Sequence, residues 1–531
     1  MRLPTARSRA ATVLALVVAG SVVLTAAPAS AAPNTERLGD KLAREVTVGG
    51  VNRHLIALQR IADQNGGTRA SGTPGFDASA TYVHDKLAAA GWNVTDQEFE
   101  FPFFQELAPP ELDRISPDPK VFVPGEEVVT YQFSAAGEVT GVVQPIDLTI
   151  PATPEPSSTS GCEAADFAGF TAGNIALIQR GTCLFADKVA NATAAGAIAV
   201  VIFNEGQPGR TEPFAGGLGG PVTVPVVGIS YTEGVHFAEL AAAGPVTARV
   251  ETQTLSETRT TRNVIAETPG GRADNVVFAG AHLDSVTEGP GINDNGTGSA
   301  ALLELGLKLG DERVKNKVRL AFWGGEEGNL LGSTFYVEQL SFEQQLDIAL
   351  YLNFDMIGSP NWGEFIYDGD DSDGEGAGAG PFGSAQIEAL ISGYVETRKG
   401  VPTEGTDFDG RSDYGPFIAV GIPSGGIFTG AEVPKTAEQQ AKWGGTAGIP
   451  FDPCYHQACD NLGNVNRSIL DKNADAVAFA VGRYALDTSD INGVGATGAK
   501  AKAAAAKAKA ARTAAARTTA LSTPSPATQA A

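Results

Sequence analysis

From residue 263 onward, short apolar strands alternate with helical segments, and this alternation limits the fold more than any other sequence feature. β-Branched and apolar runs predict strands at Asn275–Ala281, Lys317–Trp323 and Ile348–Phe354. The segments between them predict helices at Gly298–Leu309 and Ser333–Leu340. Strands and helices that alternate in this way build a sheet covered by helices on both faces. The sequence therefore predicts an α/β domain.

Acidic or imidazole side chains follow each of these three predicted strands. His282 and Asp284 follow the first strand, Glu326 and Glu327 follow the second, and Asp355 follows the third. In open α/β sheets the carboxyl ends of the strands form the functional crevice. We therefore expect these side chains to lie close together.

Two further residues belong to the same pattern. Asp294 lies in a Gly/Asn-rich loop directly before a predicted helix, and His456 lies between Cys454 and Cys459. Simpler explanations exist, because Asp294 could cap a helix, the paired glutamates could face solvent, and His282 could be a hydrogen-bonded core residue. Two of the chain's five histidines nevertheless fall in a pattern that includes acids after three successive strands. This coincidence favours a common site.

Carboxylates crowded in this way, without Lys or Arg nearby in the sequence, repel one another unless a cation joins them. His282, His456, Asp294, Glu327 and Asp355 offer nitrogen and oxygen ligands, which suit zinc. Five ligands exceed the four of one tetrahedral ion and suit two ions that share a carboxylate. Two Zn²⁺ ions carry +4, the three carboxylates carry −3, and a bridging hydroxide would bring the sum to zero. The sequence therefore predicts a pair of zinc ions.

The arrangement of these residues resembles the secreted bacterial leucyl aminopeptidase and aminopeptidase Y family of co-catalytic zinc peptidases. The resemblance covers roughly residues 45–105 and 260–487. It implies a three-layer zinc-peptidase fold with a central mixed sheet flanked by helices. The motifs that carry it are His282-Leu283-Asp284, Asp294-Asn295, Glu326-Glu327, Asn353-Phe354-Asp355-Met356, Asp409-Gly410-Arg411-Ser412-Asp413, Lys442-Trp443-Gly444-Gly445 and Cys454-Tyr455-His456.

The resemblance also implies a division of the metal ligands. One zinc ion would be held by His282 and Asp355, and the other by Glu327 and His456. Asp294 would bridge the two ions, and family members often have a cis peptide bond after this residue.

Further side chains receive roles by the same resemblance. Glu326 matches the general base, and Asp284 matches the carboxylate that orients the His282 ring. Tyr455 matches a phenol that hydrogen-bonds the developing oxyanion. Arg411 matches a residue at the substrate end of the pocket, and Met356 and Phe428 would line a hydrophobic slot for the first side chain.

The segment between the two matched regions has a different character. Residues 130–255 contain short strand-like runs, Gly/Pro turns and one Ala-rich helix near Asp187–Ala195. They resemble a protease-associated (PA) domain, a small β-rich module that interrupts the catalytic domain in several family members. The runs that predict strands are Glu138–Val143, Asn174–Gln179, Ala197–Phe203 and Val222–Ile229, and the motifs that carry the resemblance are Arg180-Gly181-Thr182-Cys183, Ala195-Gly196-Ala197 and Val224-Pro225-Val226.

These observations divide the chain into five parts. Residues 40–125 and 258–490 form the peptidase domain, and residues 130–257 form the inserted domain. The proline-rich stretch Pro102–Pro124 is interpreted as a linker. Residues 1–31 have the positive, apolar and small-residue regions of a secretory signal, and residues 491–531 form a low-complexity Ala/Lys/Thr tail.

Export permits disulfide bonds, and sequence proximity favours the pairs Cys162–Cys183 and Cys454–Cys459 over the other two connectivities. The cysteine spacings fit no common zinc-finger pattern. No stretch other than the signal approaches the ~18 apolar residues of a membrane span. The sequence predicts a secreted, extracellular protein.

One structural calcium ion is a further option that the resemblance raises. Asp471 and Asp475 lie four residues apart on a predicted helix and share a face, as in the calcium site of some relatives. Glu45 and the Val46 carbonyl would complete the site where the family has an Asp. A solvated helix face explains the two aspartates equally well, so both interpretations stay open.

The net charge of −23 argues against nucleic-acid binding, because the protein's field repels phosphates. We expect a monomer that hydrolyses peptides or unfolded proteins from the N-terminus. The rival functions are a carboxypeptidase or glutaminyl cyclase on the same scaffold, and a non-catalytic ectodomain that binds a partner. The sequence contains no G-x-S-x-G motif, which argues against a serine hydrolase, and no H-E-x-x-H motif, which argues against a protease of that zinc-binding type.

Overall fold

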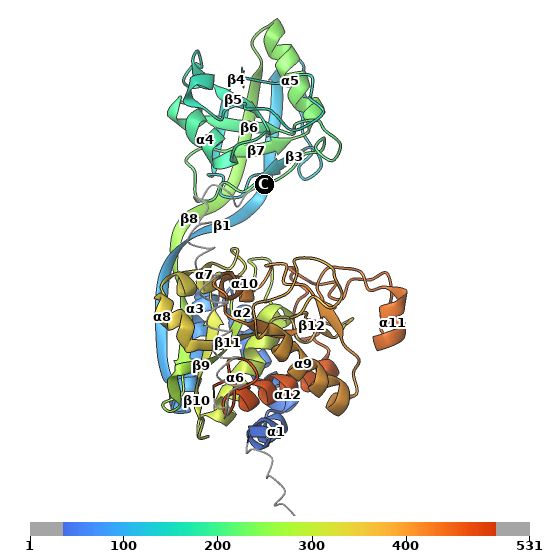
Figure 1. Ribbon diagram of the computed structural model, residues 1–531. Helices are drawn as coiled ribbons and strands as arrows, with labels where there is room; N and C mark the ends of the chain where they lie inside the picture. The colour runs from blue at the N-terminus through green and yellow to red at the C-terminus, as the bar shows by residue number, and fades with distance from the viewer. Residues whose placement is uncertain (1–34, 495–531) are drawn as a thin grey trace, which may run out of the picture.

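The computed structural model describes residues 35–494, which form a larger and a smaller body joined by two long paired strands (Figure 1). The predicted signal at 1–31 and the predicted tail beyond residue 494 lie outside these residues. The joining strands are β1 (Asn93–Ser116) and β8 (Thr247–Glu267), and we call the pair the strap. The strap belongs to the sheets of both bodies, so one continuous 14-stranded sheet runs through the molecule.

A mixed sheet forms the centre of the larger body. Its strand order is β13-β12-β14-β11-β9-β10-β8, with β1 paired to β8 at the end. β14, β11, β9 and β10 are parallel, whereas β8 and β12 run antiparallel to their neighbours β10 and β14. The strands are β9 (Arg272–His282), β10 (Asn316–Trp323), β11 (Ile348–Phe354), β12 (Phe365–Tyr367), β13 (Glu404–Thr406) and β14 (Ser424–Phe428).

Alternate side chains of the central strands face two separate hydrophobic layers. Phe278, Trp323 and Tyr351 pack with helices on one face, and the neighbouring aliphatic residues pack with helices on the other. The first face is covered by α7 (Leu331–Glu338), α8 (Phe342–Asp347) and α10 (Tyr414–Ala419). The second is covered by α1 (Thr35–Glu45), α2 (Val48–Gln64), α3 (Pro74–Ala89), α6 (Thr297–Leu309), α9 (Ser384–Tyr394) and α12 (Arg467–Tyr484). The predicted three-layer architecture is confirmed.

The smaller body contains a sheet in the order β8-β4-β5-β6-β7-β3, with buried apolar clusters on its two faces. Strands were predicted at four of these positions, and all four are present. The elements are β3 (Val128–Thr130), β4 (Gly137–Ile146), β5 (Ile175–Gln179), β6 (Ala199–Phe203), β7 (Val226–Ile229), α4 (Phe185–Ala194) and α5 (Tyr231–Ala243). Two short elements remain. β2 (Lys120–Val121) pairs with β1, and α11 (Ala437–Trp443) lies between β14 and α12 in the sequence.

The prediction of a linker at Pro102–Pro124 is wrong, because most of this stretch is strand β1. β1 pairs with β8 from Asn93 to Ser116, and the pairing register shifts between Ala108 and Glu111, where Pro109 and Pro110 lie. Proline lacks the N–H that a central strand must donate, but it is tolerated at irregularities and on edge strands. The prolines therefore interrupt the ladder locally without ending the strand.

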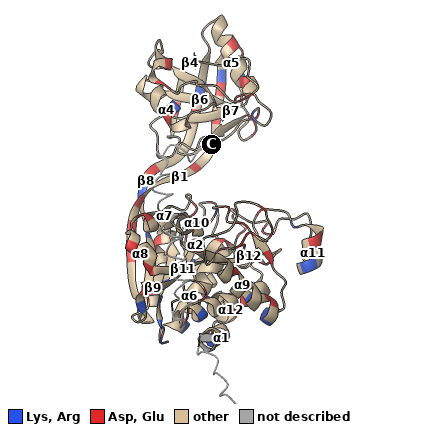
Figure 2. Ribbon diagram, in the orientation of Figure 1, with Lys and Arg blue, Asp and Glu red and all other residues tan. Residues whose placement is uncertain are grey.

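Charged residues are spread over both bodies. Figure 2 shows Asp and Glu on each body and along the strap, with Lys and Arg dispersed among them. Several of the cations are paired, as where Arg249 of the strap contacts Glu111 at 2.7 Å and Glu138 at 2.6 Å. This distribution accords with the acidic composition of the chain, and the absence of nucleic-acid binding stays a prediction.

Candidate metal centre

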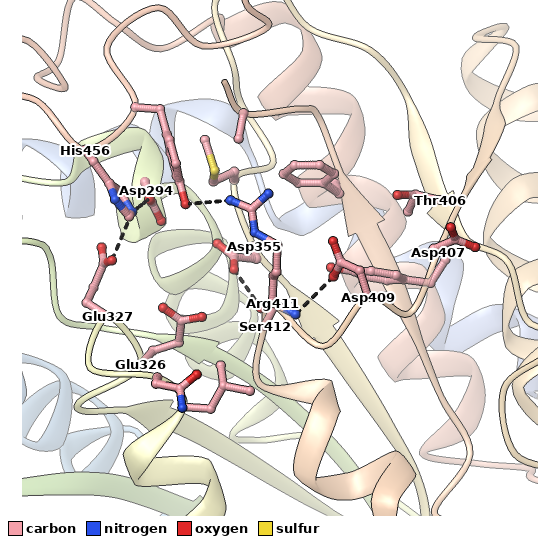
Figure 3. A pocket seen from close by; sticks show the side chains of 17 residues that line it. Asp294, Glu326, Glu327, Asp355, Thr406, Asp407, Asp409, Arg411, Ser412 and His456 are labelled. Carbon is pink, nitrogen blue, oxygen red and sulfur yellow. Dashed lines mark hydrogen bonds and ion pairs between the residues drawn. The ribbon is translucent and has the colours of Figure 1, made fainter. Parts of the chain in front are cut away.

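The predicted ligands meet at the carboxyl edge of the central sheet. His282 is the last residue of β9, Glu327 lies four residues beyond the end of β10, and Asp355 directly follows β11. Asp294 lies in the short segment Ile292–Gly296 that leads into α6. These parallel strands end side by side, so residues far apart in the sequence converge at one point (Figure 3).

His456 approaches this edge from a loop that the Cys454–Cys459 disulfide closes. Its backbone has a φ of 56°, and its ring stacks on that of Tyr455 with 3.8 Å between the centroids. The disulfide and the stacking restrain the imidazole, which points at Asp294 and Glu327 (Figure 3).

Distances between the side chains divide the cluster into two groups that share Asp294. His282 Nε2 lies 3.2 Å from Asp294 Oδ1 and 3.3 Å from Asp355 Oδ1. His456 Nε2 lies 3.3 Å from Asp294 Oδ2 and 3.0 Å from Glu327 Oε2. Asp294 thus offers a different carboxylate oxygen to each histidine. The peptide bond between Asp294 and Asn295 is cis.

These spacings fit metal ligation. Two ligand atoms at ~2.0–2.2 Å from one tetrahedral ion lie ~3.3–3.5 Å apart. The four distances above are close to that value. In addition, Glu327 Oε1 is buried and has no hydrogen-bond partner within residues 35–494. An unpartnered buried carboxylate oxygen is costly unless a cation satisfies it.

The electrostatics of the cluster also favour a cation. Burial lowers the pKa of His282, but the charges of Glu326 and Asp355 outweigh it, and the net pKa is well above the usual value. Burial and the charge of Asp294 raise the pKa of Glu327 to about 7. Among the described residues, no Lys or Arg forms an ion pair with Glu327 or the other predicted carboxylate ligands. The carboxylates therefore raise the pKa of both histidines, and divalent ions bound between the same side chains would take the place of these protons.

Glu326 and Asp284 lie beside the ligands rather than among the closest contacts. Glu326 Oε2 is 3.8 Å from His282 Nε2, farther than either Asp294 or Asp355. Burial raises the pKa of Glu326 well above its usual value. On the other side of the His282 ring, Nδ1 lies 3.2 Å from the Asp284 carbonyl oxygen and 3.6 Å from its carboxylate. Asp284 is thus placed to orient the ring.

The predicted substrate residues line a cavity of about 360 Å³ that opens beside the ligands. Met356 and Phe428 give it an apolar wall, and Arg411 and Tyr455 lie at its rim. Arg411 forms an ion pair with Glu432 at 2.9 Å and donates a hydrogen bond to the Tyr455 hydroxyl at 3.3 Å. Arg411 therefore fixes the position of the phenol.

Two residues that no sequence pattern indicated support the predicted ligands from behind. Both carboxylate oxygens of Asp460 accept backbone N–H bonds, from Asn293 at 2.8 Å and from Asp294 at 3.0 Å. The buried Arg69 guanidinium donates to the carbonyls of Leu283 and Pro290 in the loop after β9. More than 160 residues separate the partners in each case, so no local pattern could reveal these contacts.

The candidate calcium residues have other partners. Asp475 forms an ion pair with Lys399, and Asp471 accepts the Val48 N–H at 3.3 Å. Glu45 lies 3.8 Å from the Lys41 ammonium, and Val46 is buried. The Lys399 ammonium stands against the carboxylate that a calcium ion would use. Calcium binding stays an untested prediction.

Comparison with known proteins identifies the family. Residues 263–481 match peptidase family M28, and residues 143–237 match the PA domain. An aminopeptidase of Pseudomonas aeruginosa is 45% identical over 469 residues, which cover 86% of this chain and 85% of that protein. The chain belongs to peptidase family M28. The predicted class of enzyme, a metallo-aminopeptidase with an inserted PA domain, is confirmed.

Other relatives of this M28 peptidase agree. A leucine aminopeptidase 2 of Trichophyton equinum is 46% identical over 329 residues, which cover 62% of this chain and 66% of that protein. The solved structure of an aminopeptidase from Aneurinibacillus sp. strain AM-1 aligns with a TM-score of 0.58 and 27% identity, covering 83% of this chain and 95% of that one. BSAP, a zinc aminopeptidase from Bacillus subtilis, has the same fold, with a TM-score of 0.51, 23% identity and coverage of 85% and 95%.

Both predicted disulfides, Cys162–Cys183 and Cys454–Cys459, are present. Within residues 35–494, no helix combines the length and apolar character needed to cross a membrane.

Proposed function

We propose that this M28 peptidase is an exported enzyme that uses two zinc ions to remove hydrophobic, leucine-like residues from the N-termini of peptides. One observation carries the proposal. The two oxygens of Asp294 face different histidines, at 3.2 Å and 3.3 Å, as a carboxylate shared by two ions would. Support for zinc itself comes from the nitrogen and oxygen donor set and from the zinc enzyme among the structural relatives.

In this proposal the residues keep the roles that the family resemblance implies. His282 and Asp355 would hold one ion, Glu327 and His456 would hold the other, and Asp294, which lies near both histidines, would be shared by the two. Zinc bound in such a site polarises a carbonyl group and lowers the pKa of water.

Glu326 is the proposed general base. Its carboxylate lies 3.8 Å from the His282 imidazole at the edge of the cluster, and burial raises its pKa above that of an exposed glutamate. Glu326 Oε2 accepts a proton from the attacking water. It then delivers this proton to the amide nitrogen of the departing peptide, so the carboxylate is regenerated in each cycle.

Two groups at the cavity rim complete the proposed mechanism. The Tyr455 hydroxyl, held by Arg411, donates a hydrogen bond to the oxygen of the scissile carbonyl as negative charge develops there. The free α-amine of the substrate is attracted by the carboxylates around the ligand cluster, which limits cleavage to the first peptide bond. The first side chain then enters the space beside Met356 and Phe428.

Measurements on the purified mature protein test the proposal. Metal analysis should give two zinc ions per chain, and a panel of aminoacyl-p-nitroanilides should be hydrolysed fastest with leucine. A chelator should abolish the activity, and added Zn²⁺ should restore it. A metal content of one or none, or release of C-terminal instead of N-terminal residues, would contradict the proposal. Recovery of the protein from culture medium, with its N-terminus near residue 32, would support export.

A further inference from the structure

A second cavity, of about 220 Å³, lies between the strap and the loops that follow β9 and β10. Its apolar wall comes from β1, through Phe101, Phe103 and Phe104, and from Phe133 of the PA domain. The exposed side chain of Gln132 also lines it. We call this cavity the strap cleft. Both domains contribute to it, so its shape depends on the inserted domain.

The strap cleft and the substrate cavity lie on opposite sides of the ligand cluster. The substrate cavity reaches from the loop after β10, which contributes Glu326, Asn329 and Leu330, to residues of, or next to, β11, β14, β12 and β13, which continue the sheet in one direction. The strap cleft adjoins β9, β10 and the β8–β1 strap, which continue it in the other. Glu327 lines both cavities, so they meet at the ligands.

This order along the sheet edge corresponds to the order of residues in a bound peptide. A peptide with its first side chain beside Met356 and Phe428, and its first peptide bond at the ligand cluster, must extend away from that cavity. The strap cleft is the described cavity that borders the cluster on that side.

On this basis we propose that the strap cleft binds the second and third residues of the substrate, with a preference for apolar side chains. The inference rests on the proposed aminopeptidase function and assigns the PA domain a part in substrate binding.

The chemistry of the cleft suits this occupant. The rings of Phe104 and Phe133 meet edge to face, with 5.8 Å between their centroids, and an apolar side chain can pack against them. Phe133 is held in place because Ser256 of the strap donates a hydrogen bond to its carbonyl at 3.0 Å. The exposed Gln132 side chain offers both a donor and an acceptor to a peptide backbone.

The test compares three substrates. Leucinamide releases ammonia and has no second residue, Leu-Gly-Gly has a backbone without side chains beyond the first, and Leu-Phe-Phe has both. We expect the wild-type enzyme to favour Leu-Phe-Phe over Leu-Gly-Gly in kcat/KM. In Phe104→Ala, the ratio of kcat/KM for Leu-Phe-Phe to that for leucinamide should fall roughly tenfold, the effect of losing one aromatic contact.

A second variant keeps the test conclusive if Phe104→Ala does not fold. Gln132→Trp changes an exposed residue and fills the cleft, so it should lower the same ratio while the protein stays folded. Leu107→Ala is the matched control, because Leu107 lies on β1 like Phe104 but is 60% exposed and outside the cleft. It should leave the ratio unchanged.

Failure of this inference differs from failure of the proposed function. If wild-type enzyme hydrolyses none of the three substrates, the aminopeptidase function itself is wrong. If leucinamide is hydrolysed but both cleft variants keep the wild-type ratio, the strap cleft does not bind the residues after the cleaved bond, and the inference is overturned.

Discussion

Two acidic regions of this molecule look alike in the sequence and differ in the structure. At the ligand cluster, Asp294 and its neighbours are buried and have histidines as their ion-pair partners. On α12, Asp475 is paired with Lys399, and Asp471 accepts a backbone N–H. The contrast teaches that buried carboxylates suit a metal site when their partners are histidines, whose ring nitrogens can themselves bind an ion. A lysine ammonium instead occupies the place that an ion would take.

The largest expected effect comes from removing the shared carboxylate. In Asp294→Ala, both proposed ions lose a ligand, so zinc per chain should fall from two to one or none and leucine release should drop to background. Asp475→Ala is the matched control in the other acidic region and should keep both zinc ions. Metal analysis with an activity assay checks both variants. Two zinc ions in Asp294→Ala would show that this carboxylate is not needed to bind either ion.

Replacing the proposed base should separate activity from metal binding. Glu326→Gln keeps the size of the side chain but cannot accept the proton, so kcat should fall roughly 10²–10⁴-fold. Zinc content should stay at the wild-type value, because Glu326 is farther from His282 than the proposed ligands are. Steady-state kinetics on Leu-p-nitroanilide and metal analysis give the two numbers. A variant that loses its zinc would show that Glu326 is a ligand instead.

A smaller effect is expected from the carboxylate that supports Asp294 from behind. In Asp460→Asn, an amide NH₂ group replaces one of the two carboxylate oxygens. A donor then faces a backbone N–H that previously had an acceptor, so the Asp294 loop should shift. Zinc affinity, measured by competition with a chelator, should weaken by roughly 10–100-fold. Asp368→Asn is the control, because Asp368 also accepts backbone N–H bonds, from Asp370 and Ser372, away from the cluster. Equal zinc affinities in the two variants would contradict a supporting role for Asp460.

The smallest effect is expected at the candidate calcium site. Because Lys399 already balances Asp475, millimolar Ca²⁺ should shift the melting temperature of the wild-type protein by less than ~1 °C. Differential scanning fluorimetry with and without Ca²⁺ checks this. Stabilisation by several degrees would show that Ca²⁺ displaces the lysine, and Lys399→Ala should then bind the ion more tightly.

The sequence predicted the parts of the site that follow from local patterns. His282, Glu327 and Asp355 each come after an apolar run long enough to be a buried strand, and parallel strands bring such residues to one edge. The alternation of strands and helices likewise predicted the three layers. Asp294 and His456 lie in loops, which carry no periodicity that fixes their position. The Gly/Asn-rich loop before a helix and the flanking cysteines indicated them, and the resemblance to a family then supported them.

Other features depend on contacts between distant segments and could not be predicted. Arg69 and Asp460 form hydrogen bonds with backbone groups more than 160 residues away, and no sequence pattern near them indicates these partners. The strap was missed for a different reason. Proline is a strong sign of irregular structure in a single sequence, but Pro109 and Pro110 lie at a register shift on a strand whose partner, β8, comes more than 100 residues later.

The pairing of β1 with β8 has a consequence for how this protein could have been assembled. Glu106 and Thr254 are register partners, so the chain departs for the PA domain and returns from it through positions that face each other across one ladder. A two-stranded ribbon of this kind can be closed by a tight turn at almost any rung. A whole module can therefore be gained or lost at the tip of what is, for the rest of the fold, an ordinary hairpin, without reordering any other strand.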